Sequence, residues 1–253
     1  MKRLLGFFLI VAMFSLTAGE LLASDPNPKD LYIQAEIFFD QGKYEEALSL
    51  FQKAADKGDA DSQYYLGYLY NNGLGVPQDQ TLAAQWYQKA ADQGLPLAQH
   101  NLGCSYFYGE GVPQNQGLAV QLYKKAAEQG LPQAQFNLGN SYFNGEGVPR
   151  DHTLATQWYQ KAAEQGLPDA QYNLGNSYYF GRGVPQNHAL AAQWFQKAAD
   201  QGFPQAQYNL GAMFYKGQGV PRNRTLAVQL YQKAASQGDQ YAQKRLTEMG
   251  LNW

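Results

Sequence analysis

The sequence predicts an all-α fold in which pairs of antiparallel helices stack into a superhelical solenoid. The first observation is an internal repeat, because residues 73–77 return as a Gly-x-Gly-Val-Pro motif every 36 residues. The copies begin at Gly73, Gly109, Gly145, Gly181 and Gly217. The second observation is that the flanks keep the same register, with Gln and Leu-Gly before each motif and Lys-Ala-Ala after it. Self-similarity at one fixed period is typical of stacked repeat proteins.

The first half of each repeat is expected to be a helix. In the third repeat, apolar residues recur at a spacing of four from Ala134 through Leu138 to Tyr142, which places them on one helical face. Pro132 suits the first helical turn, where a missing N–H is tolerated. Gly145 is expected to end the helix, since glycine adopts a positive φ without steric cost.

The second half of each repeat is expected to be another helix. Asp151 offers a side-chain oxygen to the free amides of the helix start, and the apolar run from Leu154 to Ala163 ends before Gly166. Four residues occupy the same capping position in the other repeats: Asp79, Asn115, Asn187 and Asn223.

A glycine recurs inside every predicted first helix, although glycine costs about 1 kcal/mol relative to alanine there. These residues are Gly67, Gly103, Gly139, Gly175 and Gly211. We expect them to be structural and to allow the backbone of another helix to cross at close range.

Taken together, the Ala-Gln, Leu-Gly, Gly-x-Gly-Val and Lys-Ala-Ala elements resemble the Sel1-like repeat, a relative of the tetratricopeptide repeat with a longer loop. The resemblance covers about residues 59–238. It implies a right-handed superhelix of antiparallel helix pairs, and a role as a scaffold or adaptor for other proteins. Residues 29–58 resemble a tetratricopeptide unit with a shorter connection, which we expect to cap the stack.

The N-terminus differs in kind from the rest of the chain. Lys2 and Arg3 precede an uncharged apolar run from Leu4 to Leu16, and small residues follow up to Ser24. This pattern is typical of a secretory signal peptide, and the run is short for a membrane span of about 20 residues. We therefore expect an exported protein, periplasmic or secreted, without a transmembrane segment in its mature form.

These observations divide the chain into eight parts. They are a signal peptide (1–24), a linker with the N-terminal hairpin (25–58), five repeats (59–94, 95–130, 131–166, 167–202 and 203–238) and a C-terminal capping helix with a short tail (239–253).

Composition and motifs argue against several classes of function. The net charge is −2, so the basic surface of a nucleic-acid-binding protein is not expected. Cys104 is the only cysteine, which excludes an intramolecular disulfide. The three histidines, His100, His152 and His188, are expected to be polar surface residues too far apart to share a metal, with His152 and His188 outside any groove. No metal or cofactor is expected, and the protein is expected to be a monomer.

The alternative class is an enzyme. Cysteine-rich Helicobacter proteins with similar repeats have been described as penicillin-binding and weakly β-lactamase-active, but this chain lacks their cysteines. It also lacks the Ser-x-x-Lys and Lys-Thr-Gly elements that place a serine beside its activating lysine. A β-lactam- or peptidoglycan-acting enzyme is thus the alternative reading, and no catalytic residue is assigned.

A partner is expected on the concave side, which the first helices line in tetratricopeptide-type stacks. We number each first helix so that the leucine that recurs in every repeat, such as Leu138, is position seven. Positions five, nine and twelve then form one helical stripe. Position twelve holds Asn71, Phe107, Phe143, Tyr179 and Tyr215. The candidate partner-binding residues at positions five and nine are Tyr64, Tyr68, His100, Cys104, Phe136, Asn140, Tyr172, Asn176 and Tyr208.

Flat aromatic rings and amides suit an extended polypeptide segment, because an amide both donates to and accepts from a peptide backbone. Asn140 and Asn176 are expected to make such contacts. The alternative, that the aromatic residues merely pack between helices, stays open. Asn101, Asn137, Asn173 and Asn209 recur at position six and are expected to hold adjacent helices together. The leading hypothesis is an exported scaffold that binds a polypeptide; a structural envelope protein without a groove ligand is a third reading.

Overall fold

A computed structural model describes residues 26–253, and this part of the chain is helical with no strand. The expected signal peptide lies outside the described residues. Twelve helices have 13 residues each: α2 (Pro28–Asp40), α3 (Tyr44–Asp56), α4 (Ala60–Asn72), α5 (Gln80–Asp92), α6 (Pro96–Tyr108), α7 (Gln116–Glu128), α8 (Pro132–Asn144), α9 (His152–Glu164), α10 (Pro168–Phe180), α11 (His188–Asp200), α12 (Pro204–Lys216) and α13 (Arg224–Ser236). The last, α14 (Gln240–Glu248), has 9 residues.

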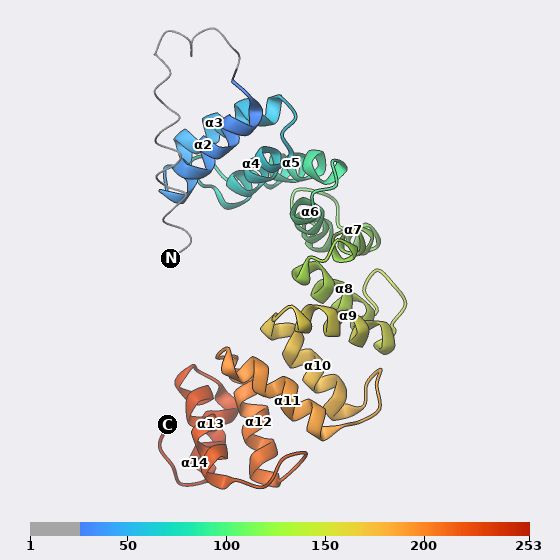
Figure 1. Cartoon of the computed structure of the whole chain (residues 1–253), viewed down its shortest axis with the longest axis vertical. Helices are drawn as coiled ribbons and strands as arrows, with labels where there is room; N and C mark the ends of the chain where they lie inside the picture. The colour runs from blue at the N-terminus through green and yellow to red at the C-terminus, as the bar shows by residue number, and fades with distance from the viewer. Residues whose placement is uncertain (1–25) are drawn as a thin grey trace.

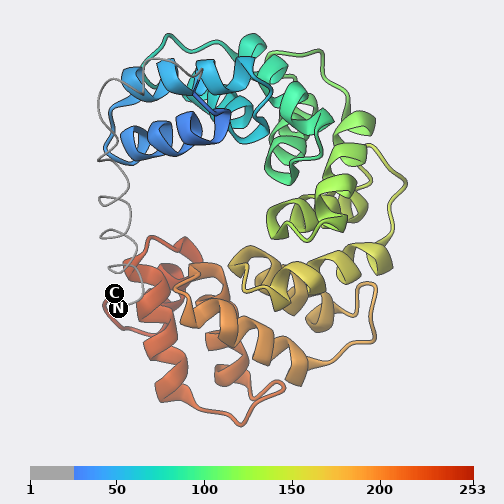
Figure 2. The same cartoon turned by 45° about the horizontal axis from the view of Figure 1, so that its top comes forward.

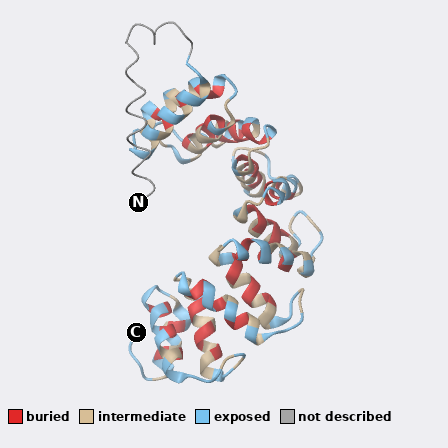
Figure 3. Ribbon diagram, in the orientation of Figure 1, coloured by how far each residue is buried: buried red, intermediate tan, exposed pale blue. Residues whose placement is uncertain are grey.

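Each helix packs mainly against the helices directly before and after it in the chain. The predicted repeats one to five are the pairs α4–α5, α6–α7, α8–α9, α10–α11 and α12–α13, preceded by the hairpin α2–α3 and followed by α14. The pairs succeed one another along a curved path (Figure 1), and a second view shows them as an open ring (Figure 2). Buried residues run through the middle of the whole stack (Figure 3). The all-α solenoid prediction is confirmed.

The helix boundaries follow the predicted capping residues. Asp151 accepts hydrogen bonds from the backbone amides of Thr153 and Leu154 at the start of α9, at 2.8 and 3.0 Å. The equivalent Asp79, Asn115, Asn187 and Asn223 cap α5, α7, α11 and α13. At the other end of α8, Gly145 takes a left-handed conformation with a φ of 80°.

The second glycine of each Gly-x-Gly motif has a further role that the sequence did not reveal. A Cβ on Gly147, which has a φ of 73°, would collide with the backbone carbonyl of Gln116 at the start of the preceding second helix. Corresponding collisions arise at the same position in the other repeats: Gly75, Gly111, Gly183 and Gly219. The motif therefore both turns the chain and lets one repeat lie directly on the previous one.

The glycines inside the first helices make a closer contact than the expected one. A Cβ on Gly139 would lie 2.7 Å from two ring carbons of Tyr159 in α9, and 3.3 Å from the Ala155 carbonyl oxygen. The ring, rather than the crossing helix backbone, is thus the nearest neighbour. The corresponding rings are Tyr87, Tyr123, Phe195 and Tyr231. The structural role and the close approach of the second-helix backbone are confirmed, and the aromatic ring is a nearer neighbour that the sequence did not reveal.

A ladder of glutamines joins the repeats. Gln135 in α8 is 5% exposed, and its amide donates to the Ala127 carbonyl at the end of α7, at 3.1 Å. Gln165, which ends α9, donates to the Gln135 side-chain oxygen and to the Gly130 carbonyl, both at 2.9 Å. The same pairing recurs at the other junctions as Gln63–Gln93, Gln99–Gln129, Gln171–Gln201 and Gln207–Gln237. One pair, of a buried and an exposed glutamine, therefore connects two second helices, a loop and a first helix.

The apolar core is continuous across these junctions because each cluster takes residues from neighbouring repeats. One cluster joins Val120 and Tyr123 of α7 to Leu138 of α8, with Trp158 of α9 packed against it. A single helix pair could not bury its apolar surface alone, so stacking supplies the core.

Substituting Gly139 by alanine should lower stability by about 1–3 kcal/mol, because the new methyl group would force the buried Tyr159 ring to move. Gly117 in α7 is a matched control, since a Cβ there would meet only the Asn115 side-chain oxygen, at 3.4 Å. Gly117→Ala should raise stability by about 0.5–1 kcal/mol. Urea denaturation of both variants measures the difference, and an unchanged or raised midpoint for Gly139→Ala would contradict the ring contact.

Gln135→Ala should cost about 1–3 kcal/mol, because it removes a buried hydrogen bond to the Ala127 carbonyl and the side-chain oxygen that accepts from Gln165. Gln160→Ala is the control. It removes only an exposed hydrogen bond to Glu164, so its effect should stay within about 0.5 kcal/mol. Equal, small shifts of the urea midpoint in the two variants would show that the ladder does not stabilise the junction.

Candidate interaction surface

The predicted partner-binding residues lie on the first helix of each repeat. In Figure 2, α2 lies on the inner side of the curve and α3 on the outer side. All of the residues at positions five and nine are half-buried: Tyr64, Tyr68, His100, Cys104, Phe136, Asn140, Tyr172, Asn176 and Tyr208. Each therefore contacts the fold with one part of its side chain and keeps another part accessible.

The aromatic residues at position five pack on the second helix of their own repeat. The ring centroids of Phe136 and Tyr159 are 5.9 Å apart, and those of Tyr172 and Phe195 are 5.8 Å apart. The same arrangement holds for Tyr64, His100 and Tyr208. The packing interpretation thus applies to these rings, and Tyr172 and Tyr208 also contact Phe203 and Tyr241 of the next junction. Each side chain still keeps an accessible part.

The rings at position twelve bring an unexpected pair of residues to this surface. The His152 ring lies 4.8 Å from Phe143, and the His188 ring lies 4.9 Å from Tyr179, between ring centroids. Both histidines are half-buried, and their Nδ1 atoms are buried without a hydrogen-bond partner among the described residues. The expectation that they are exposed surface residues was therefore wrong, because the turn before each second helix folds them onto the position-twelve ring. Their place outside the groove stays a prediction.

The side-chain oxygen of Asn140 is already hydrogen-bonded within the fold, which the sequence did not suggest. Its side-chain oxygen accepts a hydrogen bond from the Tyr159 hydroxyl at 2.7 Å and another from the Asn173 amide at 3.3 Å. Burial raises the pKa of Tyr159, against a smaller opposing effect of Asn173. The phenol therefore stays a neutral donor. The prediction of a free amide at Asn140 was wrong, whereas the expected bridging role of Asn173 is confirmed.

In repeat two the same place is taken by Cys104, and its neighbours form a closed neutral network. The Tyr123 hydroxyl donates to Cys104 Sγ at 3.5 Å. The Asn137 amide lies 3.0 Å from His100 Nε2, and the Asn101 side-chain oxygen lies 3.1 Å from His100 Nδ1. Since an amide N–H must donate, we assign Nε2 as the acceptor and place the proton on Nδ1.

The charge states in this network disfavour nucleophilic chemistry. His100 Nε2 lies 3.8 Å from Cys104 Sγ. Burial raises the pKa of the thiol and lowers the pKa of the imidazole, so both groups are neutral. A reactive cysteine requires the opposite, a thiolate stabilised by a nearby positive charge. Among residues 26–253, no group of three or more His, Cys, Asp or Glu side chains could hold a metal ion.

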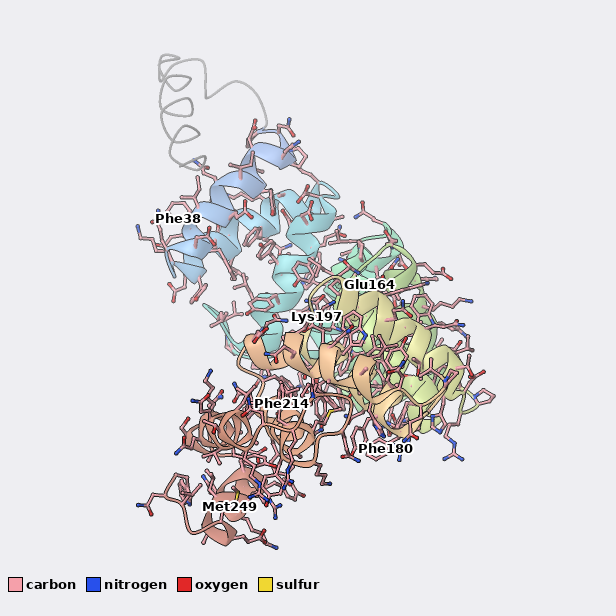
Figure 4. All side chains as sticks on the ribbon, turned by 60° about the horizontal axis from the view of Figure 1, so that its bottom comes forward. Phe38, Glu164, Phe180, Lys197, Phe214 and Met249 are labelled. Atoms are coloured by element: carbon pink, nitrogen blue, oxygen red, sulfur yellow. The ribbon has the colours of Figure 1, made fainter. Side chains whose placement is uncertain are left out.

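The concave positions also expose large apolar side chains. Leu97 at position two is 42% exposed, and Tyr108 and Phe180 at position thirteen are 66% and 55% exposed. Figure 4 shows the Phe180 side chain at the edge of the molecule, and the Arg182 guanidinium lies 4.9 Å from its ring centroid. Aromatic and apolar groups exposed along one side of a fold are typical of interaction surfaces.

Thus the molecule is a helical repeat solenoid whose first helices carry half-buried aromatic and amide side chains. The Sel1 repeat model matches residues 60–95, 96–131, 132–167, 168–203 and 204–239, and a tetratricopeptide repeat model matches residues 31–57. The chain therefore belongs to the Sel1 repeat family. This fold is typical of protein–protein interaction scaffolds, and the family is generally non-catalytic.

Two solved structures resemble the chain along most of its length. A Sel1 repeat protein from Oxalobacter formigenes is 35% identical, with a TM-score of 0.80 over 86% of each chain. A protective antigen present in uropathogenic Escherichia coli strains is 39% identical, with a TM-score of 0.79 over 88% of this chain and 51% of the antigen.

A more limited similarity links the chain to a eukaryotic protein. It is 40% identical over 57 residues to the ERAD-associated E3 ubiquitin-protein ligase component HRD3 of Candida glabrata, which is 22% of this chain and 7% of that protein. The chain thus spans a small part of this relative and about half of the Escherichia coli antigen. Within the described residues, no helix combines the length and the apolar character needed to cross a membrane.

Proposed function

We propose that this protein is an exported scaffold that binds a polypeptide partner along its concave side. The observation that carries the proposal is the gathering of accessible aromatic and apolar groups on the first helices. Tyr108 and Phe180 are exposed at the rim, and the position-five rings are half-buried below them. Rigid aromatic side chains supply contact area at a low cost in conformational entropy, which suits the recognition of an extended segment.

Binding is favoured over catalysis by the chemistry of the same surface. Its only cysteine–histidine pair is neutral, and its other polar groups are amides, phenols and the imidazoles of His152 and His188. A β-lactam- or peptidoglycan-acting enzyme would need an activated nucleophile, and the sequence has neither Ser-x-x-Lys nor Lys-Thr-Gly. Export is supported by the basic start and short apolar run of residues 1–24, which is typical of a signal peptide.

Site-specific photo-crosslinking tests the location of the partner. A photoreactive phenylalanine analogue at position 108 or 180 should crosslink a polypeptide in cells that produce the protein naturally. The same group at Gln157, which is exposed on the second helix of repeat three, should not. A partner captured equally well from position 157, or captured from that position alone, would place binding outside the concave side.

Export is tested on the mature N-terminus. The protein recovered from outside the cytoplasm should lack the apolar run, as measured by intact mass and N-terminal sequencing. Leu9→Arg should block export by placing a charge in that run, so the full-length chain should accumulate inside the cell. Leu9→Val is the matched control and should be processed normally. Recovery of an exported protein that retains Met1 and the apolar run would contradict signal removal.

A further inference from the structure

We propose that recognition is concentrated at the junction of repeats four and five, where Asn176 and Asn209 present unpaired amides to the main chain of the bound polypeptide. This inference rests on the proposed function and specifies which part of the concave side carries it.

The inference starts from a three-residue network at the junctions between repeats. It consists of position nine of a first helix, the buried ring of the following second helix, and position six of the next first helix. In repeat three the network is closed, because Asn140 accepts hydrogen bonds from both Tyr159 and Asn173. In repeat two, Tyr123 donates to Cys104, and Asn137 reaches both Cys104 and His100.

The networks of repeats one and five also give the ring hydroxyl a polar neighbour. Burial raises the pKa of Tyr87, and Asn101 of the next first helix opposes this rise. Burial raises the pKa of Tyr231 to about 12, and Arg245 of α14 opposes it both by its charge and by a hydrogen bond. In four of the five repeats, therefore, the residue at position six interacts with a phenol.

Repeat four is different because its ring is Phe195. A Cβ on Gly175 would lie 2.7 Å from two Phe195 ring carbons, just as a Cβ on Gly139 would lie 2.7 Å from two carbons of Tyr159. The ring is therefore placed as in the other repeats, and only the hydroxyl group is missing. Asn176 and Asn209 occupy positions nine and six, and both are half-buried. Neither side chain has a hydrogen-bond partner among the described residues, in contrast to Asn140 and Asn173.

Two half-buried amides without an internal partner are suited to a peptide backbone. Each amide has a carbonyl oxygen that accepts from a main-chain N–H and an NH₂ group that donates to a main-chain carbonyl. The two residues come from successive first helices, so a strand that crosses these helices can meet both. The amides of repeat three lack this freedom, because the oxygen of Asn140 is already taken by two donors.

The surroundings favour a neutral, extended internal segment as the occupant. Positions five and nine of repeats three to five hold no charged residue: they are Phe136, Tyr172, Tyr208, Asn140, Asn176 and Ala212. Neutral side chains at these positions complement uncharged main-chain groups. The charged groups nearest to them are Arg182, beside the Phe180 ring, and Arg245, near Tyr208. Phe180, 55% exposed at the rim of the same repeat, supplies an apolar contact for a side chain of the segment.

The experiment uses peptides selected for binding to the mature protein. A displayed library of random 12-residue peptides is panned against it, and selected sequences are synthesised with capped ends and titrated by fluorescence anisotropy. Asn176→Ala with Asn209→Ala should weaken binding about 5- to 100-fold, as expected for the loss of one hydrogen bond from each amide. The urea midpoint of this double variant should be unchanged, since no internal hydrogen bond is lost.

A reciprocal exchange of rings provides the matched controls. Phe195→Tyr adds the missing hydroxyl, which should close the network of repeat four, raise the urea midpoint and weaken peptide binding. Tyr159→Phe opens the network of repeat three, so it should lower the midpoint without weakening binding. Single N-methylation along the peptide should identify a main-chain amide whose loss weakens binding to the wild type but not to the Asn176→Ala, Asn209→Ala variant.

The outcomes separate this inference from the proposed function. If the peptides lose affinity on Tyr108→Ala and Phe180→Ala but bind the Asn176→Ala, Asn209→Ala and Phe195→Tyr variants normally, the inference fails while concave binding stands. If no peptide is selected, or if all of these variants bind equally well, the concave polypeptide site is overturned as well.

Discussion

The structure depends on one contact that recurs in every repeat, an aromatic ring lying directly on a glycine of the first helix. No side chain larger than hydrogen fits at Gly139 while the Tyr159 ring stays in place. This contact fixes the distance and rotation between the two helices of a pair. It also places the outer end of the ring next to position nine of the same first helix and next to position six of the following first helix. A packing constraint inside the pair therefore decides where the polar groups of the concave side meet.

The repeats are joined by a second set of constraints that is mostly polar. The Gln135–Gln165 pair satisfies backbone carbonyls where one second helix ends and the next first helix begins. A buried amide that loses its hydrogen-bond partner lowers the stability of the fold. A shift of one repeat relative to the next would break these pairs, so the glutamines favour one stacking geometry. Gly147 adds a steric requirement, because it lies on the backbone at the start of α7. Together these contacts make each junction resemble the next, and the curvature is propagated along the stack (Figure 1).

Variation is confined to places that this scaffold leaves free. The ring position tolerates Phe195 instead of tyrosine because its packing on Gly175 is unaffected. The hydroxyl contributes nothing to that packing, but it decides whether the neighbouring amides are occupied. Asn140 and Asn176 thus have the same position and residue type, but the second-helix ring beside Asn140 carries a hydroxyl group and the one beside Asn176 does not. The phenolic oxygen of the second-helix ring thus determines whether the amide at position nine of the first helix already has a hydrogen-bond partner.

The sequence by itself determined the helices, their caps, the period and the order of the repeats, because these features follow from local rules. Proline at a helix start, Asp or Asn at a cap and glycine at a positive φ act within a few residues of where they stand. It also placed the candidate residues on the first helices, because helical periodicity fixes which positions share a face. What only the tertiary structure decided were contacts between residues about 19 to 37 positions apart. The ring on each glycine, the pairs of glutamines and the difference between Asn140 and Asn176 all arise there. The packing of His152 on Phe143 and of His188 on Tyr179 also needed the tertiary structure, because it depends on the path of the loop between them. Periodicity says which side a residue faces, but hydrogen bonding depends on which atoms of another helix come within about 3 Å.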